Sequence, residues 1–283
     1  MISSIRYKSP SNIDLKGKNG RIYSFWCYNF EGNLDKSANK KSTLAIVKIN
    51  AFFSKWVDHI TYNSNRALEV HQSIGYKNMN YSIIANGFEL DKFCFNASKR
   101  NMLREKLSIA NNIKVIITVG RWNVQKDYNT LLKALSLVLK NRKDFIMIMV
   151  GTNLDNNNLD LIKLKREFHL ANNLLLLGRR DDIPDLLSLS DIYISSSIGE
   201  SFSNSIGEAM ACELPCVVTN VGDSKILVGD TGYVIKPGDY KGLEHKIFNL
   251  LENNSIERCP RARERILKNY EINEIVRQIE KIF

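Results

Sequence analysis

The chain has 283 residues and a formal net charge of +10, with 44% hydrophobic and 25% charged residues. At about 150 residues per domain this is room for one large or two modest domains, and the composition excludes disordered, collagen-like and disulfide-stapled proteins. The longest apolar runs, such as 145–150, are far shorter than the roughly 18 residues of a membrane-spanning helix, so no transmembrane helix is expected.

Positive charge is concentrated near the amino terminus, where residues 1–60 hold ten basic and four acidic side chains. A basic surface can attract nucleic acid, anionic lipid or phosphorylated small molecules, or be solvated with no partner, and charge alone does not choose among them. The five cysteines form no C-x-x-C pair and the first ten residues carry no export signal. We therefore expect reduced thiols in a cytoplasmic protein.

The first 110 residues show an irregular α/β pattern. Strand-like runs alternate with segments of helical period, but a full doubly wound sheet needs more strands than these. The expected strands are 22–28, 57–64 and 81–86, and the expected helices are 42–55, 65–74 and a polar boundary helix within 96–112. This part is typical of an incomplete α/β domain.

From residue 113 onward, near-continuous apolar runs are separated by single helix-period segments, which predicts a parallel sheet covered on both faces. The expected strands are 113–120, 145–151, 173–178, 191–197 and 215–222, and the expected helices are 127–140, 159–170, 183–190, 203–212, 239–252 and 256–282, the last broken near 269–271. We expect three parts: an incomplete domain over 1–105, a Rossmann-like domain over 106–265, and a carboxyl-terminal helix over 266–283 that crosses back to the first domain.

The segment GRWNVQK (120–126) follows the first strand of the second domain. It places Arg121 and Lys126 at the carboxyl edge of a parallel sheet, where open α/β sheets bind ligands. A forked guanidinium beside a flexible ammonium suits a diphosphate. The alternative is a solvated basic loop.

A second candidate is GESFSNSIGEAMA (199–211), which opens a helix near Ser203. Amide groups at a helix start favour anions, so backbone and hydroxyl donors here can hold phosphate oxygens. The residues concerned are Phe202, Ser203, Asn204 and Ser205. For Glu208 a purely structural role as a helix cap is a strong alternative, because Ser205-x-x-Glu208 fits a capping box.

The combination of motifs is more specific than any one of them. GRWNVQK, GRRDDIPDLLSLSDIYISSS (178–197), GESFSNSIGEAMACELPCVVTNVGD (199–223) and GDTGYVIKPGD (229–239) occur in the order and spacing of a known family. The chain resembles GT-B glycosyltransferases of family 4, of the bacterial O-antigen and capsule type, over roughly residues 24–283. Upstream, YSIIANGFELDKF (81–93) is similar to the segment that closes the first domain of that family.

The resemblance implies roles for charged residues, carried over position by position. Arg121 and Lys126 would grip the donor diphosphate and stabilise its charge as the sugar leaves. Glu208, the second carboxylate of a Glu-x7-Glu pair, would accept hydrogen bonds from the ribose hydroxyls. Glu200 would lie at the hydroxyls of the donor sugar.

The resemblance also implies contacts made by backbone. Amide groups near Ser201 and Phe202 would lie beside the donor sugar. The loop from Arg179 through Arg180 to Ile183 would face the nucleotide base. No Asp-x-Asp occurs in the sequence, so neither a metal nor another cofactor is expected. The expected donor is a UDP-sugar, and the choice of uridine rests only on its being the usual base in that family.

The first domain departs from the family pattern, because about 105 residues precede the nucleotide domain and no glycine-rich loop is found in residues 1–30. The leading hypothesis is a retaining transferase that adds a sugar to a lipid-linked surface polysaccharide, with a peripheral contact to the anionic cytoplasmic face of the inner membrane. The alternative is a truncated, inactive remnant or subunit that still binds nucleoside diphosphates. Nucleic-acid binding lacks any supporting motif, and an oxidoreductase lacks G-x-G-x-x-G after a strand.

Overall fold

The computed structural model describes residues 12–16, 22–28, 41–77, 79–252 and 258–282, with backbone alone for 12–16, 22–28 and 41–44. Contacts divide the chain into two units. The first unit comprises residues 1–87, 199–202 and 272–283, and the second comprises 88–198 and 203–271. In the described part of the chain, no helix is long and apolar enough to span a bilayer.

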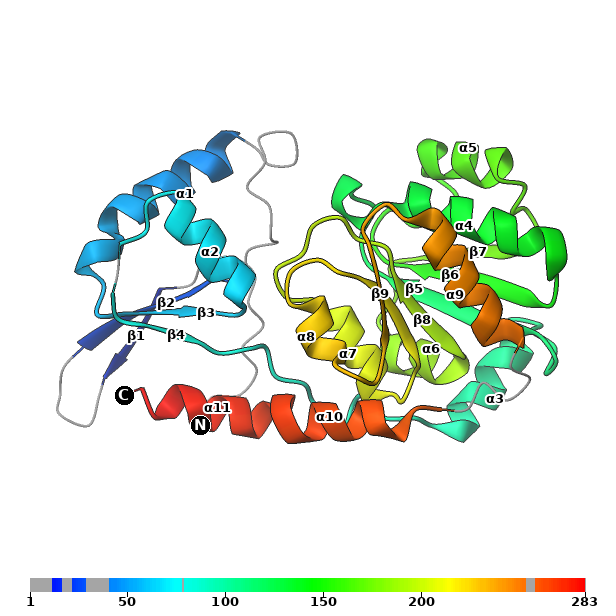
Figure 1. Cartoon of the computed structure of the whole chain (residues 1–283). Helices are drawn as coiled ribbons and strands as arrows, with labels where there is room; N and C mark the ends of the chain where they lie inside the picture. The colour runs from blue at the N-terminus through cyan, green and yellow to red at the C-terminus, as the bar shows by residue number, and fades with distance from the viewer. Residues whose placement is uncertain (1–11, 17–21, 29–40, 78, 253–257, 283) are drawn as a thin grey trace. The chain divides into compact units, whose positions relative to one another are not determined.

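The first unit is built on a four-stranded sheet of order β1-β2-β3-β4. Its strands are β1 (Asn12–Lys16), β2 (Ile22–Tyr28), β3 (His59–Tyr62) and β4 (Tyr81–Ile83). β1 is antiparallel to β2, whereas β2, β3 and β4 are mutually parallel. Figure 1 shows α1 (Lys41–Phe53) and α2 (Asn65–Ser73) over one face of this sheet and α11 (Ile272–Glu280) along the other.

A small apolar core holds the first unit together. Ile60 and Tyr62 of β3 are buried against Val47 and Ala51 of α1 and Ala67 of α2. The start of α2 is fixed by a cap, since the backbone N–H of Ala67 donates to Ser64 Oγ at 3.0 Å.

The second unit is built on a six-stranded sheet in which every pairing is parallel, as expected for α/β winding. Its strands are β5 (Lys114–Val119), β6 (Phe145–Val150), β7 (Leu174–Gly178), β8 (Ile192–Ser195), β9 (Cys216–Thr219) and β10 (Tyr233–Ile235). The spatial order is β10-β9-β8-β5-β6-β7. The chain winds from β5 through β6 to β7, then returns to β8 on the other side of β5, so the winding reverses between β5 and β8.

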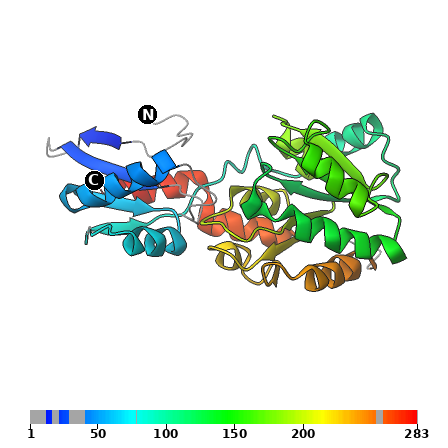
Figure 2. The same ribbon diagram turned by 90° about the horizontal axis from the view of Figure 1, so that it is seen from above.

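Helices cover both faces of this sheet (Figure 2). One layer is α4 (Tyr128–Asn141), α5 (Leu159–Glu167) and α9 (Tyr240–Glu252), which share a core with β5, β6 and β7. The other side carries α3 (Ala97–Lys106), α6 (Ile183–Leu189), α7 (Asn204–Ala211), α8 (Ser224–Val228) and α10 (Pro260–Tyr270). Successive side chains along a strand point to opposite faces of the sheet. Val115, Ile116 and Ile117 are nevertheless all fully buried, because helices cover both faces.

The division between the units lies at Phe88, whereas the sequence analysis set it between 105 and 106. The difference arises from α3, whose arginines join it to the second unit. Arg100 donates to Asp191 Oδ1 at 2.7 Å, and Arg104 donates to the carbonyls of Ala110 and Ile113 at 2.6 Å each.

Candidate functional site

The reversal of winding between β5 and β8 identifies the edge of the second sheet where a ligand is expected, because the loops leaving these strands separate there. The β5 loop carries both predicted cations. Arg121 is exposed and follows Val119, the last residue of β5, by two positions. Lys126 is half-buried and ends a short 3-10 turn, Val124–Lys126.

The side chain of Lys126 folds back along its own loop toward Gly120. A Cβ atom placed at Gly120 would lie 3.4 Å from Lys126 Cε and 2.8 Å from the hydroxyl of Tyr128. A side chain at residue 120 would clash with the hydroxyl of Tyr128, whereas Lys126 lies at an ordinary contact distance from this position. The Lys126 side chain therefore lies beside the residue that precedes Arg121, and both cations belong to one short loop.

Hydrogen bonds join the β5 loop to the loop that follows β8. Ser196 Oγ donates to the carbonyl of Lys126 at 2.7 Å, and the N–H of Ile198 donates to the carbonyl of Gln125 at 2.7 Å. On the other side, Thr219 Oγ1 at the end of β9 donates to the carbonyl of Ser197 at 2.5 Å. Hydrogen bonds thus join the β5 loop, the β8 loop and the end of β9 at the carboxyl edge of the sheet.

The sequence analysis did not identify Ser196 and Thr219. The signal available was the run of serines at 195–197, which is polar at the end of an otherwise apolar strand and is buried in the structure. Such buried hydroxyls need partners, and the nearest unpaired groups at a strand end are the carbonyls of neighbouring loops.

Glu200, Ser201 and Phe202 follow this loop in the chain and belong to the stretch 199–202 that groups with the first unit. All three are buried, and the Glu200 residue is 6% exposed. A buried carboxylate is costly without polar partners, so this position is under a chemical constraint that an ordinary loop glutamate does not have.

The helix expected after this loop is α7, which begins at Asn204 with Ser203 as its N-cap. Asn204 is exposed and Ser205 is half-buried. Ser205 Oγ accepts a hydrogen bond from the hydroxyl of Tyr193 at 2.8 Å and lies 3.3 Å from Ser203 Oγ. Serine hydroxyls and helix-start amides therefore gather at the carboxyl end of β8.

The capping box, which was the alternative explanation for Ser205 and Glu208, is not present in the structure. Ser205 lies inside the helix rather than at its cap, and no side chain caps α7 at Ser203. The third helical position, where a capping-box glutamate would stand, is occupied by Ile206. The sequence motif takes Ser205 as the N-cap, two residues after the N-cap of the structure, Ser203. Glu208 therefore has no capping role.

Glu208 is a partly buried carboxyl group on the second turn of α7. Burial raises its pKa to about 7, and the nearby positive charge of Lys92 acts in the opposite direction. Within the described residues, no side chain or backbone group donates a hydrogen bond to this carboxyl group. A carboxyl group in this state can accept hydrogen bonds from hydroxyl groups of a ligand once it is ionised.

Close packing sets the position of α7. A Cβ atom placed at Gly207 would lie 2.0 Å from the ring of Phe88, so helix and ring approach each other only because residue 207 has no side chain. The backbone N–H of Phe88 donates to the carbonyl of Tyr270 at 2.8 Å, which holds the ring-bearing segment in place.

Arg180 and Ile183 lie after β7, on the same edge of the sheet but two strands from β5, or about 10 Å away. The guanidinium of Arg180 donates two hydrogen bonds to Asp182, from Nε at 2.8 Å and from Nη2 at 2.5 Å, and this pairing lowers the pKa of Asp182. The charge of Arg180 is therefore already compensated, which leaves the backbone of this loop as its means of contacting a ligand.

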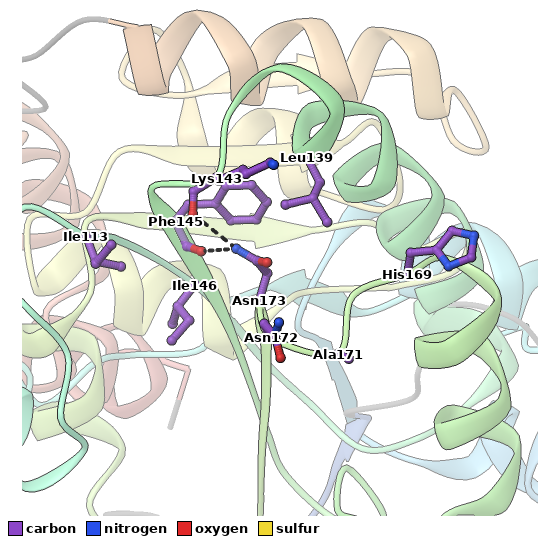
Figure 3. Close-up of a pocket in the computed structure, with 9 residues that line it drawn as sticks. All are labelled: Ile113, Leu139, Lys143, Phe145, Ile146, His169, Ala171, Asn172 and Asn173. Atoms are coloured by element: carbon purple, nitrogen blue, oxygen red, sulfur yellow. Dashed lines mark hydrogen bonds between the residues drawn. The ribbon is translucent and has the colours of Figure 1, made fainter.

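A pocket of about 460 Å³ lies at the opposite edge of the sheet (Figure 3). It is formed where β5, β6 and β7 begin and contains none of the predicted site residues. Asn173 at its centre already donates to the carbonyl of Phe145 at 2.6 Å. This pocket is accordingly distinct from the edge that carries Arg121 and Lys126.

Acidic and metal-ligating residues do not gather on the described surface. Among the residues that the structure describes, no three His, Cys, Asp or Glu side chains lie close enough to hold a metal ion. The absence of a metal from the reaction stays a prediction.

Comparisons with known proteins agree on one family. The profile of the family described as "Glycosyl transferases group 1" matches residues 99–271, more than half of the chain. The N-acetyl-alpha-D-glucosaminyl L-malate synthase of Bacillus anthracis is 29% identical over 65% of this chain and 49% of that protein. The Escherichia coli UDP-Gal:alpha-D-GlcNAc-diphosphoundecaprenol alpha-1,3-galactosyltransferase is 27% identical over 87% of this chain and 65% of that protein.

Solved structures show the same fold. The crystal structure of HepE from Anabaena in complex with UDP and glucose has a TM-score of 0.80 and 22% identity, covering 91% of this chain and 70% of that one. The structural neighbours are GT-B glycosyltransferases, which confirms the expected α/β fold class with parallel sheets. The chain spans about half to two thirds of the length of the two curated relatives.

Proposed function

This chain belongs to the glycosyl transferases group 1 family, and we propose that it binds a nucleotide sugar at the carboxyl edge of its second sheet and transfers the sugar to an acceptor. One observation carries the proposal: the β5 loop with Arg121 and Lys126 is hydrogen-bonded to the loop after β8 at the point where the winding of the sheet reverses.

The donor diphosphate would lie against Arg121 and Lys126, with the amide groups at Ser203, Asn204 and Ser205 as further donors. As the bond between the anomeric carbon and the phosphate oxygen breaks, negative charge grows on the diphosphate, and the two cations stabilise it. The residues present supply this charge without a metal ion, which is why we propose a metal-independent reaction.

The nucleoside would extend from the diphosphate along the sheet edge. Glu208 would accept hydrogen bonds from the ribose hydroxyls, and the backbone from Arg180 to Ile183 would face the base. Glu200, together with the amides of Ser201 and Phe202, would contact the sugar. A uridine donor is supported by the HepE complex with UDP and by the UDP-Gal donor in the name of the Escherichia coli relative.

The transfer is proposed to retain the configuration of the anomeric carbon. The acceptor hydroxyl oxygen bonds to that carbon on the face that the phosphate leaves, and the departing phosphate oxygen takes the hydroxyl proton. A lipid-linked saccharide acceptor is supported by the diphosphoundecaprenol in the name of the same relative. Relatives named for capsular polysaccharide and lipopolysaccharide core biosynthesis support a surface polysaccharide as the product.

The test is a calorimetric titration of the chain with UDP, GDP and ADP, followed by assay of sugar transfer to a lipid-linked acceptor. We expect UDP to bind, and we expect Arg121→Ala and Lys126→Ala each to lower transfer by about 2–4 kcal/mol of transition-state stabilisation. Arg166→Ala is the matched control, because it removes one exposed positive charge from the last turn of α5.

The outcomes separate the two hypotheses that the sequence left open. Binding of UDP with transfer supports the enzyme. Binding of UDP that depends on Lys126 but gives no transfer supports a nucleotide-binding subunit or remnant. Equal affinity of the wild type, Lys126→Ala and Arg166→Ala for every nucleotide would show that this edge of the sheet is not the site.

A further inference from the structure

Helix α1 of the first unit presents a row of large apolar side chains to solvent. The residues are spaced three or four apart along α1 and the 3-10 turn Ser54–Trp56, so they share one side of the helix. This apolar stripe consists of Ile46, Ile49, Phe52, Phe53 and Trp56, which are 53%, 56%, 61%, 48% and 60% exposed. A single exposed leucine or phenylalanine needs no explanation, but a continuous stripe of five does.

The opposite side of the same helix supplies the packing that holds it. Val47, Ala51 and Val57 are buried in the core of the first unit. Ser54 is also buried, donating to the carbonyl of Ala51 at 2.7 Å and accepting from the N–H of Lys77 at 3.0 Å. The helix is therefore anchored by its buried side, and the apolar stripe is not needed to keep it in place.

The rings of the apolar stripe form a compact cluster. The ring centroid of Phe52 lies 5.3 Å from that of Phe53 and 5.3 Å from that of Trp56, and Phe53 and Trp56 are 5.7 Å apart. Lys55 lies over this cluster, with its Nζ 4.2 Å from the Trp56 ring centroid and 5.1 Å from that of Phe52. Aromatic rings beside a lysine are characteristic of the boundary between lipid headgroups and acyl chains.

The charged residues of α1 and of the 3-10 turn that carry the apolar stripe are all lysines. Lys48 and Lys55 are exposed on the helix, and the sequence contains no Asp or Glu from residue 36 to residue 57. A second copy of this chain seated on the stripe would bring lysines against lysines, whereas an anionic bilayer would attract them. The residues thus combine apolar area, interfacial aromatics and positive charge on a single helix face.

We propose that α1 docks the protein on an anionic lipid bilayer, with the apolar stripe inserted at the level of the headgroups and with Lys48 and Lys55 bound to lipid phosphates. The helix lies in the plane of the interface and does not cross it. This docking rests on α1 alone, whereas Arg121, Lys126 and Glu208 of the proposed donor site belong to the second unit.

The experiment measures co-sedimentation of the whole chain with vesicles of phosphatidylcholine, with and without phosphatidylglycerol. We expect binding that is stronger with phosphatidylglycerol and weaker at high salt. The double variant Phe52→Ser/Trp56→Ser should lower the partition coefficient at least about tenfold, and Lys48→Glu/Lys55→Glu should abolish the preference for phosphatidylglycerol. Leu159→Ser and Leu267→Ser are matched controls, because these residues are 80% and 58% exposed on the second unit, and they should bind as the wild type does.

A second measurement does not depend on the stability of the double variant. Lipids brominated on their acyl chains should quench tryptophan fluorescence of the bound protein, and Trp56→Phe, which keeps an apolar ring, should lose most of the quenching while still sedimenting. Failure of the wild type to bind phosphatidylglycerol vesicles would overturn the proposal. Equal binding by wild type and stripe variants, or a dimer in solution that the stripe variants abolish, would overturn it as well. UDP titration of the same variants should be unchanged, which distinguishes this result from a failure of the proposed transfer.

Discussion

Glu208 shows how the structure changes the meaning of a single residue. In the sequence its spacing from Ser205 matched a helix cap, whereas in the structure it is a partly buried carboxyl group without a hydrogen-bond donor in the described chain. Burial raises its pKa to about 7. Protonation of this group should consequently affect folding and ligand binding in opposite directions.

We predict that Glu208→Gln removes a pH dependence rather than a cap. The pKa rises from an ordinary 4.5 in the unfolded chain to about 7 in the folded one, so the folded state binds the proton more tightly. The free energy of unfolding should therefore fall as pH rises from about 4.5 to about 7 and then level off. Above pH 7 the glutamine variant should be more stable than the wild type by about 1–3 kcal/mol, measured by urea unfolding across this range. A variant less stable than the wild type at pH 8 would restore the capping role.

The same residue should make nucleotide affinity depend on pH in the proposed site. Only the ionised carboxylate accepts hydrogen bonds from both ribose hydroxyls, so UDP affinity should increase as pH rises through about 7. In Glu208→Gln the affinity should be lower and flat with pH, which calorimetry at several pH values measures.

Asp127 and Glu213 are two of the five described non-glycine residues that occupy backbone positions favouring glycine. Asp127 and Glu213 have φ angles of 44° and 62°, in the left-handed region. At Asp127 the backbone strain is offset by a hydrogen bond, because its side chain caps α4 by accepting from the N–H of Thr130 at 3.2 Å. Glu213 ends α7 in a Schellman arrangement, with its own N–H donating to the carbonyl of Met210 at 2.9 Å.

We predict that Glu213→Gly stabilises the protein. The backbone strain at this residue disappears, and the gain should exceed the extra entropy that glycine adds to the unfolded chain. The expected increase is about 1 kcal/mol, or about 2–4 °C in Tm by calorimetry. Glu213→Ala, which keeps the strain, is the control and should give no increase; equal effects of the two variants would contradict the explanation.

At the scale of elements, a buried acid joins α3 to the central strands. Asp191 accepts from Arg100 at 2.7 Å through Oδ1 and from the N–H of Val115 at 2.7 Å through Oδ2. The guanidinium of Arg104 lies 3.8 Å from Oδ2, and burial lowers the pKa of this arginine. One carboxylate therefore balances two arginines of α3 at the start of β5 and β8.

We predict that Asp191→Ala is severely destabilising, because it leaves Arg100 and Arg104 with uncompensated charge next to a buried strand. The expected loss is about 3–5 kcal/mol in urea unfolding. Asp144→Ala breaks an ion pair with Arg142 that is 2.6 Å long and partly exposed to solvent, and should cost under about 1 kcal/mol. Similar losses for the two variants would show that Asp191 is not a structural centre.

The sequence predicted the strands that are buried on both sides, whereas the elements that it missed are short or lack a continuous apolar run. β5, β6, β8 and β9 are continuous apolar runs, and the structure confirms each of them. β10 was missed because it has three residues, two of them exposed, and α8 because it has five. β1 was missed because its sequence, NIDLK, lacks a continuous apolar run.

The candidate site was predictable to the extent that it is local in the chain. Arg121 and Lys126 share one loop, so their neighbourhood followed from the position of β5. The bonds from Ser196 to Lys126 and from Thr219 to Ser197 join residues 70 and 22 positions apart. Such partners depend on the order of strands in the sheet, which one sequence does not specify.

At the scale of the molecule, the second unit contains a complete sheet with its own core. The strands β5 to β10 and the helices that cover them lie between residues 88 and 271. Of the predicted site residues, only Glu200, Ser201 and Phe202 group with the first unit.

We predict that a fragment of residues 88–271 folds and binds UDP. The buried cluster that runs from Ile116 to Leu251 lies entirely within the fragment, which gives it a core of its own. Circular dichroism should show cooperative unfolding, and calorimetry should give a UDP affinity within about tenfold of that of the whole chain. A fragment that lacks a cooperative transition would show that the second unit depends on the first for its fold.

The contact between Gly207 and Phe88 links the first residue of the second unit to the helix that faces the predicted anion. Even a methyl group at 207 would have to displace either the aromatic ring or α7. A displaced α7 would carry Ser203 and Asn204 with it, and the amide donors at its start would point elsewhere. The lack of a side chain at Gly207 thereby sets the position of the amide groups that would bind the phosphate oxygens.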